Sequence, residues 1–510
     1  MQQKCLKSDI YINENYFCDS LEQAIDVDFT LPDFCPDISK IFKCHAVPRI
    51  LAKSINGNGI TIDGNVIITI LYCDKDNNFC SYEYVYPFSK TMECSFDISG
   101  CNAFAKIKCD YINCRAVTGR KIDIHGAVGI FLKVFKRKCR EVVCDIDDPQ
   151  VEIKRMTTPA TTPMGYAEKY LLIEEDLPIG NGQPSIQNVI KTNSSVSIFE
   201  TKIINDKTVV KGEMAVCVLY CPENGSAPQI VKTKLPFSQI VDIEGITDNC
   251  QCECKAEICA IDVKPKLTSN GEVRCFSINA KLMLSCEAYC KKDILIIEDA
   301  FSRRFEAEIK RNKVPLNYIT DTVQEGFNCK KNVELDFNIN NVVDLWCSVQ
   351  NCHTKFETDK MVIYGTLLAD MIICDENNIP LYVEKPIDFE YKYPFKGGKG
   401  IAYCEPEIEV LSCGFTIISS TNIELLVELG INASIYEKRE ISVVSDLCIN
   451  EDKILKRSDD TAMVIYYNCE NESIWNIAQK FSASVEEINL VNNIEKGENL
   501  KSGMLLIPLN

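Results

Sequence analysis

The sequence predicts a multidomain, mainly β protein with three tandem β-rich domains, each with one short helix, and a small C-terminal βααβ domain. The main observation is a strand-like segment that begins with glycine and ends with cysteine and occurs three times, at 64–73, 212–221 and 365–374. The spacing of about 150 residues between copies is that of a whole domain rather than of one turn of a solenoid. We therefore predict an architecture built by triplication.

The repeated positions around this segment are apolar, which indicates that the repeat preserves a hydrophobic core. Apolar residues precede each glycine at the same spacing: Ile38, Ile41 and Phe42; Ile186, Val189 and Ile190; Ile339, Val342 and Val343. A Pro-Phe pair follows each copy: Pro87-Phe88, Pro236-Phe237 and Pro394-Phe395. In the first copy, Pro36 suits the first position of a short helix that turns these apolar residues inward.

Composition excludes several classes of function. A chain of 510 residues is long enough for three to four domains, each able to bury its own core. The net charge of −18 argues against nucleic acid and anionic membranes as partners, since both require a basic face. No apolar run approaches the ~18 residues of a membrane span, and the N-terminus lacks a hydrophobic signal core. We expect a cytosolic protein without membrane insertion.

The 29 cysteines are expected to be reduced and to act as small buried hydrophobic residues, because the chain is large and lacks a signal sequence. Oxidative cross-linking after assembly is the alternative. In the segment 250–258, cysteines and other apolar residues alternate with polar ones, which predicts a half-buried strand with a cysteine face. A zinc site is disfavoured, because the sequence has no Cys-x-x-Cys and only three histidines. We predict no metal and no cofactor.

Turn signals and repeats divide the chain. The motif Glu-Ile-Lys-Arg recurs at 152–155 and 308–311, and a Thr/Pro-rich stretch at 157–163 is expected to be extended and exposed. The predicted divisions are an N-terminal segment, three β-rich domains separated by connectors, a linker and the C-terminal domain, at 1–29, 30–145, 146–176, 177–298, 299–328, 329–449, 450–462 and 463–510.

The C-terminal 48 residues have a different pattern. Residues 463–468 favour a strand, and 472–481 an amphipathic helix with Trp475 on its apolar face. Ser484 is a candidate N-cap for a second helix, with Glu487 completing a capping box. The apolar stretch 504–508 closes the domain as a strand.

This C-terminal segment resembles a LysM domain over 463–508. The resemblance rests on the Ser473–Phe481 stretch, on Asn492, and on Gly503 with Ile507-Pro508. It implies a groove for N-acetylglucosamine glycans between two loops, before the first helix and after the second. The usual Gly-Asp-Thr of the first loop is replaced here by 471–473, so that a glycan groove and a protein-binding surface both stay open. The candidate binding residues are Asn468, Glu470, Asn471, Glu472, Ser473, Asn492 and Asn493.

The triplicated unit resembles the SPOCS domain, whose repeats precede a C-terminal LysM domain in clostridial spore morphogenetic proteins of the SipL type. The shared features are the opening at 31–38, the Gly-to-Cys strand, the Pro-Phe pair and the Glu-Ile-Lys-Arg motif. The resemblance implies a non-enzymatic scaffold in the mother-cell cytoplasm, at the forespore surface. Its implied partner is the basement-layer coat ATPase (SpoIVA-like), which it binds to anchor and encase the spore coat. A peptidoglycan- or cortex-binding protein is the alternative.

Catalysis is the least supported function. The sequence has no phosphate-binding glycine loop, no nucleophile elbow and no His-Glu-x-x-His motif. Cys44-His45 and Cys352-His353 are adjacent pairs, and neighbouring side chains on a strand point to opposite faces. We predict no catalytic residues.

Overall fold

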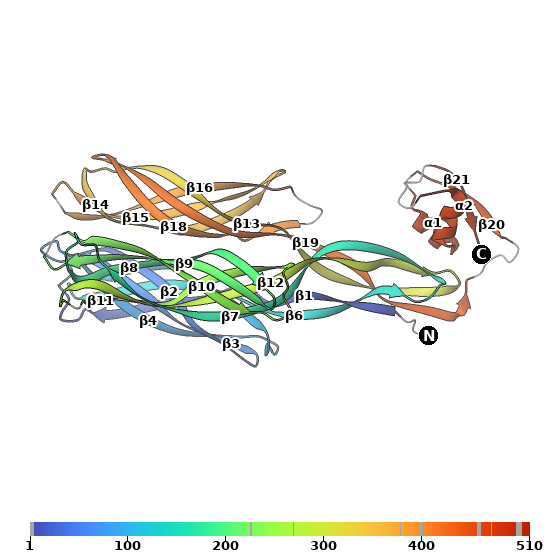
Figure 1. Cartoon of the computed structure of the whole chain (residues 1–510), viewed down its shortest axis with the longest axis horizontal. Coiled ribbons are helices and arrows are strands. Elements are labelled where there is room, and N and C mark those ends of the chain that lie inside the picture. The colour runs from blue at the N-terminus through green and yellow to red at the C-terminus, as the bar shows by residue number, and fades with distance from the viewer. Residues whose placement is uncertain are drawn as a thin grey trace.

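The computed structural model describes residues 5–224, 227–268, 270–377, 379–396, 401–455, 461–470, 472–495 and 502–509. The molecule is elongated, with three β units at one end, a stalk of paired strands in the middle and a small domain at the far end (Figure 1). The N- and C-terminal ends of the chain both lie towards the stalk end (Figure 1).

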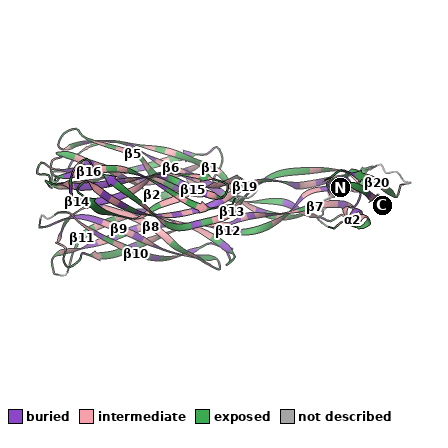
Figure 2. Cartoon of the chain, turned by 90° about the horizontal axis from the view of Figure 1, so that it is seen from above, coloured by how far each residue is buried: buried purple, intermediate pink, exposed green. Residues whose placement is uncertain are grey.

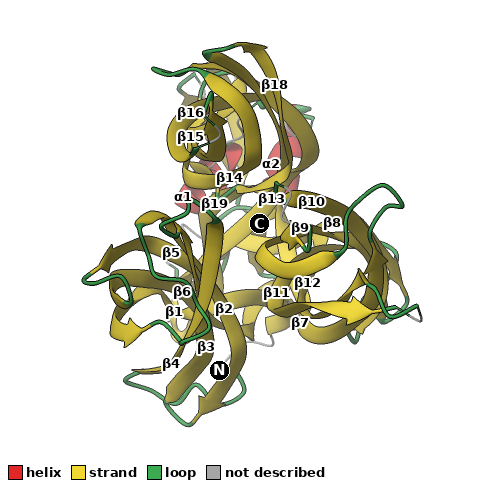
Figure 3. Ribbon diagram, turned by 90° about the vertical axis from the view of Figure 1, so that its left-hand side faces the viewer, coloured by secondary structure: helices red, strands yellow, loops and turns green. Residues whose placement is uncertain are grey.

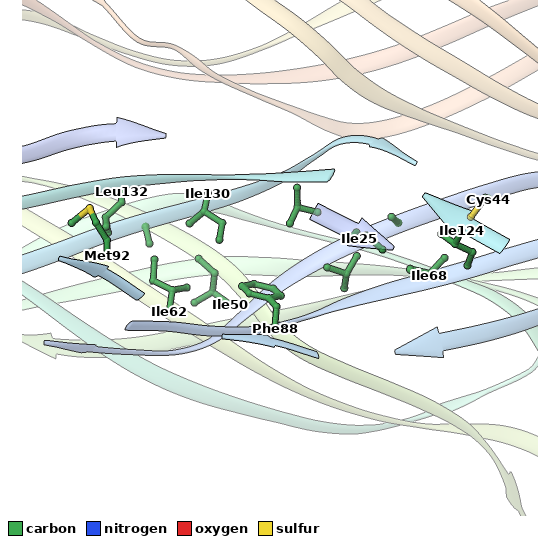
Figure 4. Close-up of a cluster of buried hydrophobic side chains, with 14 of the residues drawn as sticks. Ile25, Cys44, Ile50, Ile62, Ile68, Phe88, Met92, Ile124, Ile130 and Leu132 are labelled. Atoms are coloured by element: carbon green, nitrogen blue, oxygen red, sulfur yellow. The ribbon is translucent and has the colours of Figure 1, made fainter. Parts of the chain in front are cut away.

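Unit 1 consists of two three-stranded antiparallel sheets, with strand orders β1-β6-β5 and β2-β3-β4. Its strands are β1 (Cys5–Thr30), β2 (Lys40–Asn56), β3 (Gly59–Cys73), β4 (Phe79–Glu93), β5 (Asn102–Ala116) and β6 (Lys121–Ile146). The second sheet is a meander of consecutive strands, whereas the first brings together the first and last strands of the unit. The two sheets enclose one hydrophobic core (Figure 4).

Units 2 and 3 repeat this topology. Unit 2 has sheets β7-β12-β11 and β8-β9-β10; in unit 3, β14-β15-β16 form the meander, and β13, β17 and β18 all pair with β19. The strands are β7 (Val151–Pro178), β8 (Ile186–Ile204), β9 (Lys207–Pro222), β10 (Gln229–Asp242), β11 (Cys250–Leu267), β12 (Val273–Ser302), β13 (Phe305–Glu334), β14 (Ile339–Phe356), β15 (Lys360–Asp375), β16 (Pro380–Pro394), β17 (Ile401–Cys404), β18 (Glu407–Ser419) and β19 (Asn422–Ile454). The prediction of tandem β-rich units is confirmed.

The short helix predicted for each unit is absent from the described residues. The backbone N–H of Ile38 donates to the carbonyl of Gly119 at 2.7 Å, and β2 begins two residues later. A β-bulge between Ile41 and Lys43 then leaves Ile41 packed on the core of unit 1 and Phe42 in a separate cluster between the units. The apolar spacing therefore reflects a strand buried on both faces, which imitates a helical period. The helices described, α1 and α2 of the C-terminal domain, have eight residues each, too short to cross a membrane.

The predicted N-terminal segment and connectors are also different in the structure. The described part of 1–29 lies in β1, and most of 146–176 and 299–328 lies in β7 and β13. Each is the long first strand of a unit and pairs with its long last strand. The Thr/Pro-rich stretch is extended as predicted but partly covered, with Thr158, Ala160 and Thr162 buried. This stretch has the composition of a linker, but it forms part of a sheet because it pairs with β12.

The long strand pairs continue beyond the units and form the stalk. Each unit contributes one two-stranded ribbon, and apolar side chains from all three meet between the ribbons: Ile10, Val142, Ala160, Ile296, Val314, Leu316, Ile441 and Val443. Buried residues accordingly run from the units into the stalk (Figure 2). Viewed from the unit end, the three units surround a common axis (Figure 3).

A second cluster joins the units at the opposite end, around Phe42 of unit 1, Leu219 of unit 2 and Trp346 of unit 3. It is adjoined by an ion pair between units, in which Lys191 Nζ lies 2.8 Å from Asp344 Oδ2 with both side chains only 3% exposed. Lys191 Nζ also lies 3.0 Å from the centre of the Trp346 ring. Burial lowers the pKa of Lys191, and the Asp344 carboxylate opposes that effect.

The repeated glycine is required by close packing. A β-carbon at Gly64 would lie under 3.0 Å from the Arg49 carbonyl on β2 and from the Phe88 ring on β4. The same clash, with Phe237, would occur at Gly212. Phe88 and Phe237 are the phenylalanines of the predicted Pro-Phe pairs, and each lies directly opposite its glycine. The repeat therefore encodes a glycine covered by an aromatic ring across the sheet.

The third Pro-Phe pair was misassigned. Gly365 lies opposite Phe389, and this ring, not that of Phe395, takes the place of Phe88. Phe395 follows the end of β16 and packs against Phe356, with ring centres 5.4 Å apart. The residue before Phe389 is Asp388, so the Pro-Phe dipeptide is not the feature that the three units share.

Most of the described cysteines are buried or half-buried, as predicted, but Cys18, Cys139 and Cys469 are exposed. Of the three cysteines that end the repeat, Cys73 is buried and Cys221 and Cys374 are half-buried. The predicted cysteine face of β11 is present. The structure contradicts the prediction of reduced thiols at one point, because Cys250 and Cys290 form a disulfide. The two residues lie directly opposite each other on β11 and β12, with Cα atoms 4.4 Å apart, so the backbone itself places them within bonding range.

We expect Gly212→Ala to destabilise the protein by about 1–3 kcal/mol, because the new methyl group must displace the Phe237 ring or the adjacent strand. Equilibrium denaturation measures this change. Gly414→Ala is the matched control, since Gly414 also lies in a strand but has open space around its Cα. Equal stabilities of the two variants would contradict the packing role of Gly212.

We expect Lys191→Met to destabilise the protein by about 3–5 kcal/mol, because it leaves the Asp344 carboxylate buried without a counter-charge. The double variant Lys191→Met/Asp344→Leu removes both charges and should recover most of the loss. Chemical denaturation of the two variants and the wild type measures the difference. A double variant that is no more stable than Lys191→Met would show that the pair does not act as a unit.

Candidate functional site

The C-terminal domain has the predicted βααβ order. Its elements are β20 (Met463–Asn468), α1 (Ile474–Phe481), α2 (Val485–Asn492) and β21 (Gly503–Pro508), and the two strands pair in antiparallel fashion. Ser484 caps α2 as predicted, since its hydroxyl accepts a hydrogen bond from the Glu487 N–H at 3.4 Å. Ile488 and Ile507 are fully buried in its small core.

This domain is attached to the stalk through Trp475. The indole N–H donates to Asp299 Oδ2 at 2.8 Å, and the ring packs edge-on against Phe301 with centres 5.0 Å apart. Asp299 and Phe301 lie near the end of β12, so the C-terminal domain docks on the ribbon of unit 2. The sequence indicated only that Trp475 is a core residue; its partners are too distant in the chain for a local pattern to reveal.

Two of the predicted binding residues in the first loop have internal structural roles. Glu472 accepts hydrogen bonds from the Tyr466 hydroxyl at 2.9 Å and from the Cys469 N–H at 3.1 Å. Asn468 is buried at the end of β20, and its amide donates to the Cys469 carbonyl at 3.1 Å. These contacts close the loop that enters α1. Reversal of the Glu472 charge would therefore disturb the loop itself.

Asn492 also holds the domain together. Its amide donates to the carbonyls of Ile488 at 2.8 Å and Leu506 at 2.6 Å, and its side-chain oxygen accepts from the Leu506 N–H at 2.7 Å. The side chain thus links the end of α2 to β21. Asn493 is exposed and adopts a left-handed conformation with φ of 53°, in which its N–H caps α2.

The other predicted residues that the structure describes in the first loop are exposed. The side chains of Glu470 and Ser473 are exposed, and Ser473 makes no side-chain cap hydrogen bond with α1. Asn471 lies outside the described residues. Of the predicted set, Glu470, Ser473 and Asn493 are therefore the described residues that are exposed.

An exposed apolar face adjoins these loops and was missed in the sequence. It consists of Met463, Ile465 and Tyr467 on β20 and Met504 on β21, which are 46%, 59%, 73% and 55% exposed. The intervening Val464 and Tyr466 pack against the domain core. We call this set of four side chains the outer C-terminal face. The available signal was the unbroken run of apolar residues in 463–467, of which a two-stranded sheet can bury only one side.

A second candidate is a cavity of about 860 Å³ where the three units meet, lined by charged side chains that include Arg49, Glu257 and Glu409. Burial raises the pKa of both glutamates to about 7. Burial also lowers the pKa of His45, on the cavity wall, to about 4. The histidine is therefore neutral at pH 7 and is not held as a cation.

The charges beside this cavity connect the units to one another. Glu407 of unit 3 accepts hydrogen bonds at 3.0 Å from Lys106 of unit 1 and at 3.0 Å from Lys255 of unit 2. Burial alone would raise the pKa of Glu407, but the two lysines lower it below its usual value. Arg49 of unit 1 donates to the Ile258 carbonyl of unit 2 at 3.0 Å. We therefore assign these groups to assembly of the three units.

We expect Asn492→Ala to destabilise the C-terminal domain by about 1–3 kcal/mol, because buried backbone groups of Ile488 and Leu506 lose their partner. Hydrogen–deuterium exchange of α2 and β21 in the full chain measures the change. Asn493→Gly is the control, since glycine tolerates the left-handed conformation of that position. Unchanged exchange in Asn492→Ala would return Asn492 to the candidate binding residues.

Comparison with protein families identifies the repeated unit. The family model described as SipL, SPOCS domain matches residues 37–117 and 185–266. These segments correspond to β2–β5 of unit 1 and β8–β11 of unit 2, that is, to the same part of the fold in both units. No curated protein and no solved structure matched the chain. Through these two matches, units 1 and 2 are similar to the SPOCS domain of the SipL family.

Proposed function

We propose that this protein is a non-enzymatic morphogenetic scaffold of the spore coat, located in the mother cell at the forespore surface. The match to the SipL SPOCS family supports a role in sporulation. Unit 3 lies outside the matched segments, but its sheets follow the strand order of units 1 and 2 apart from the additional short strand β17, which supports its assignment as a third SPOCS domain.

In this proposal the C-terminal domain is a LysM domain that binds the basement-layer coat ATPase (SpoIVA-like). The observation that carries the proposal is the outer C-terminal face, an apolar surface at the end of the molecule remote from the three units. Exposed clusters of aromatic and aliphatic side chains are typical of protein-binding sites. Glu470, on the adjacent loop, is an exposed polar residue suited to the rim of such an interface.

The arrangement of the units supports a scaffold. The stalk ribbons and the buried ion pair between units 2 and 3 join the three units, and Trp475 attaches the C-terminal domain to the same stalk. Contacts made from one preorganised chain add avidity, because binding at one site raises the effective concentration at the next. Several weak contacts along the molecule can in this way anchor and encase a coat layer.

Peptidoglycan or cortex binding is the alternative, in which the two loops hold N-acetylglucosamine glycans. The protein-binding proposal is favoured because Glu472 and Asn492 already make hydrogen bonds within the domain. Polar side chains used in this way are less available to sugar hydroxyl groups.

We expect Ile465→Asp in the full-length protein to weaken binding of the coat ATPase at least tenfold, because a charge would be buried in an apolar interface. Biolayer interferometry with the purified ATPase measures the affinity. Leu172→Asp is the matched control, since Leu172 is also exposed on a strand, in unit 2. Thermal unfolding of both variants verifies that they remain folded.

Glu470→Lys tests whether the loop beside this face contributes to binding of the ATPase. Glu451→Lys in the stalk is the control, because it makes the same change of charge. Wild-type binding of the ATPase by Ile465→Asp would refute the proposed interface. Retention of the full chain on purified peptidoglycan, with no binding of the ATPase, would establish the alternative instead.

A further inference from the structure

Unit 2 contains a row of five cysteines on the inner face of one strand pair. Cys250, Cys252 and Cys254 come from β11, and Cys286 and Cys290 from β12. Cys250 and Cys290 are joined by a disulfide, and the sulfur atoms of Cys252, Cys254 and Cys286 all lie within 4.8 Å of one another. Cys286 comes from the neighbouring strand β12, so the sequence of 250–258 alone does not reveal this cluster.

Cys254 and Cys286 have the same backbone relation as the disulfide-bonded pair. Both pairs are directly opposite across β11 and β12, and no register shift occurs between them. A step of four residues along antiparallel strands returns to the same class of pair, with side chains on the same face. The backbone that accommodates one disulfide therefore provides equivalent geometry for a second.

The sulfur positions favour a disulfide over a metal site. Cys254 Sγ and Cys286 Sγ are 2.7 Å apart. Thiolate ligands at about 2.3 Å from a tetrahedral zinc ion are separated from each other by roughly 3.8 Å. The observed separation is closer to the sulfur–sulfur bond length of about 2.05 Å than to this ligand spacing.

One cysteine of the pair borders a cavity. This cavity, of about 740 Å³, lies along the edge strand β11 and is lined by Cys252 and Cys254, together with Thr322 and Asn432 of unit 3. Cys286 is fully buried beyond Cys254. A small molecule in the cavity would therefore meet Cys254 before Cys286.

We propose that Cys254 and Cys286 form a second cross-strand disulfide, through thiol–disulfide exchange with a small-molecule disulfide such as glutathione disulfide that enters this cavity. The Cys254 thiolate attacks one sulfur of the reagent, forms a mixed disulfide and releases the first thiolate. The Cys286 thiolate then attacks Cys254 Sγ and releases the second. The two cysteines lose two protons and two electrons, and the reagent is reduced to two thiols.

Cys252 lies beside the reacting pair. Its sulfur lies 3.5 Å from that of Cys254, and hydrogen bonds from the Cys254 and Cys286 thiols lower its pKa. The same contacts raise the pKa of Cys254, so a thiolate at Cys252 is too weak a base to act as the proton acceptor for Cys254. Cys252 lies opposite Ala288, so it has no direct cross-strand cysteine of its own and stays a free thiol after oxidation.

The second disulfide would stabilise the part of β11 where unit 2 contacts unit 3. Glu253, between the reactive cysteines, accepts a hydrogen bond from Ser434 of β19 at 3.0 Å. Two adjacent disulfides would hold this part of β11 against β12 and so fix the position of Glu253. Oxidation thereby acts at a contact between two units of the scaffold.

The test uses the full-length variant Cys250→Ser/Cys290→Ser, which removes the existing disulfide but keeps the other three cysteines. After treatment with glutathione disulfide and alkylation, tryptic peptides 235–255 and 282–291 are analysed without reduction. We expect the two peptides to be linked and to contain one alkylated cysteine, Cys252. Adding Cys286→Ser should reduce the linked species at least tenfold, whereas adding Cys252→Ser should leave the link and remove the alkylated cysteine.

Two results would overturn the proposal. One is the absence of linked peptides in the oxidised, folded variant, and the other is a stoichiometric zinc or copper ion that protects all three thiols from alkylation. If the double variant does not fold, the same test can be made with the wild-type protein. Its linked peptides should carry one alkylated cysteine after oxidation, and three alkylated cysteines would show that the second disulfide does not form.

Discussion

The contact between a glycine and a phenylalanine ring across each meander sheet is the constraint on which the units depend. At Gly64, Gly212 and Gly365, the ring and a carbonyl of the preceding strand occupy the space that a β-carbon would require. This packing draws the middle strand close to both neighbours and seals one face of the sheet against the core of its unit. The other face is left for contact between units. Three such units can therefore share an axis without losing their separate cores.

Polar groups determine how these outer faces meet. The apolar cluster around Phe42 and Trp346 could tolerate small displacements, but buried charges could not, because an unpaired charge in the interior is costly. Lys191 pairs with Asp344 between units 2 and 3, and Glu407 meets a lysine from each of the other two units. We interpret these ion pairs as the contacts that fix the relative positions of the units. The stalk ribbons supply the hydrophobic contacts that hold the units together.

The sequence was informative where a pattern repeated and where burial was one-sided. The Gly-to-Cys segments predicted three β units, and the apolar alternation around Cys250 predicted the face of β11. The strand before Gly64 is buried on both faces, which gave it a helix-like apolar spacing and made the helix prediction wrong. The Thr/Pro-rich stretch did not reveal β7, because the strand with which it pairs is distant in the chain. In the candidate site, residue type could not distinguish Asn492, which bonds internally, from Asn493, which is exposed. Only the three-dimensional contacts separate these roles.

Strand β12 connects the features that the sequence left separate. Its middle carries Cys286 and Cys290, and its end carries Asp299 and Phe301, which hold Trp475 of the C-terminal domain. Between these points β12 pairs continuously with β7 except at two bulges, and its apolar side chains fill the stalk. A hydrogen-bonded ribbon packed between two others resists bending, so the C-terminal domain is presented at a defined distance from the thiol face. A coat protein bound at the outer C-terminal face would therefore be held clear of the units, leaving their surfaces accessible to further contacts.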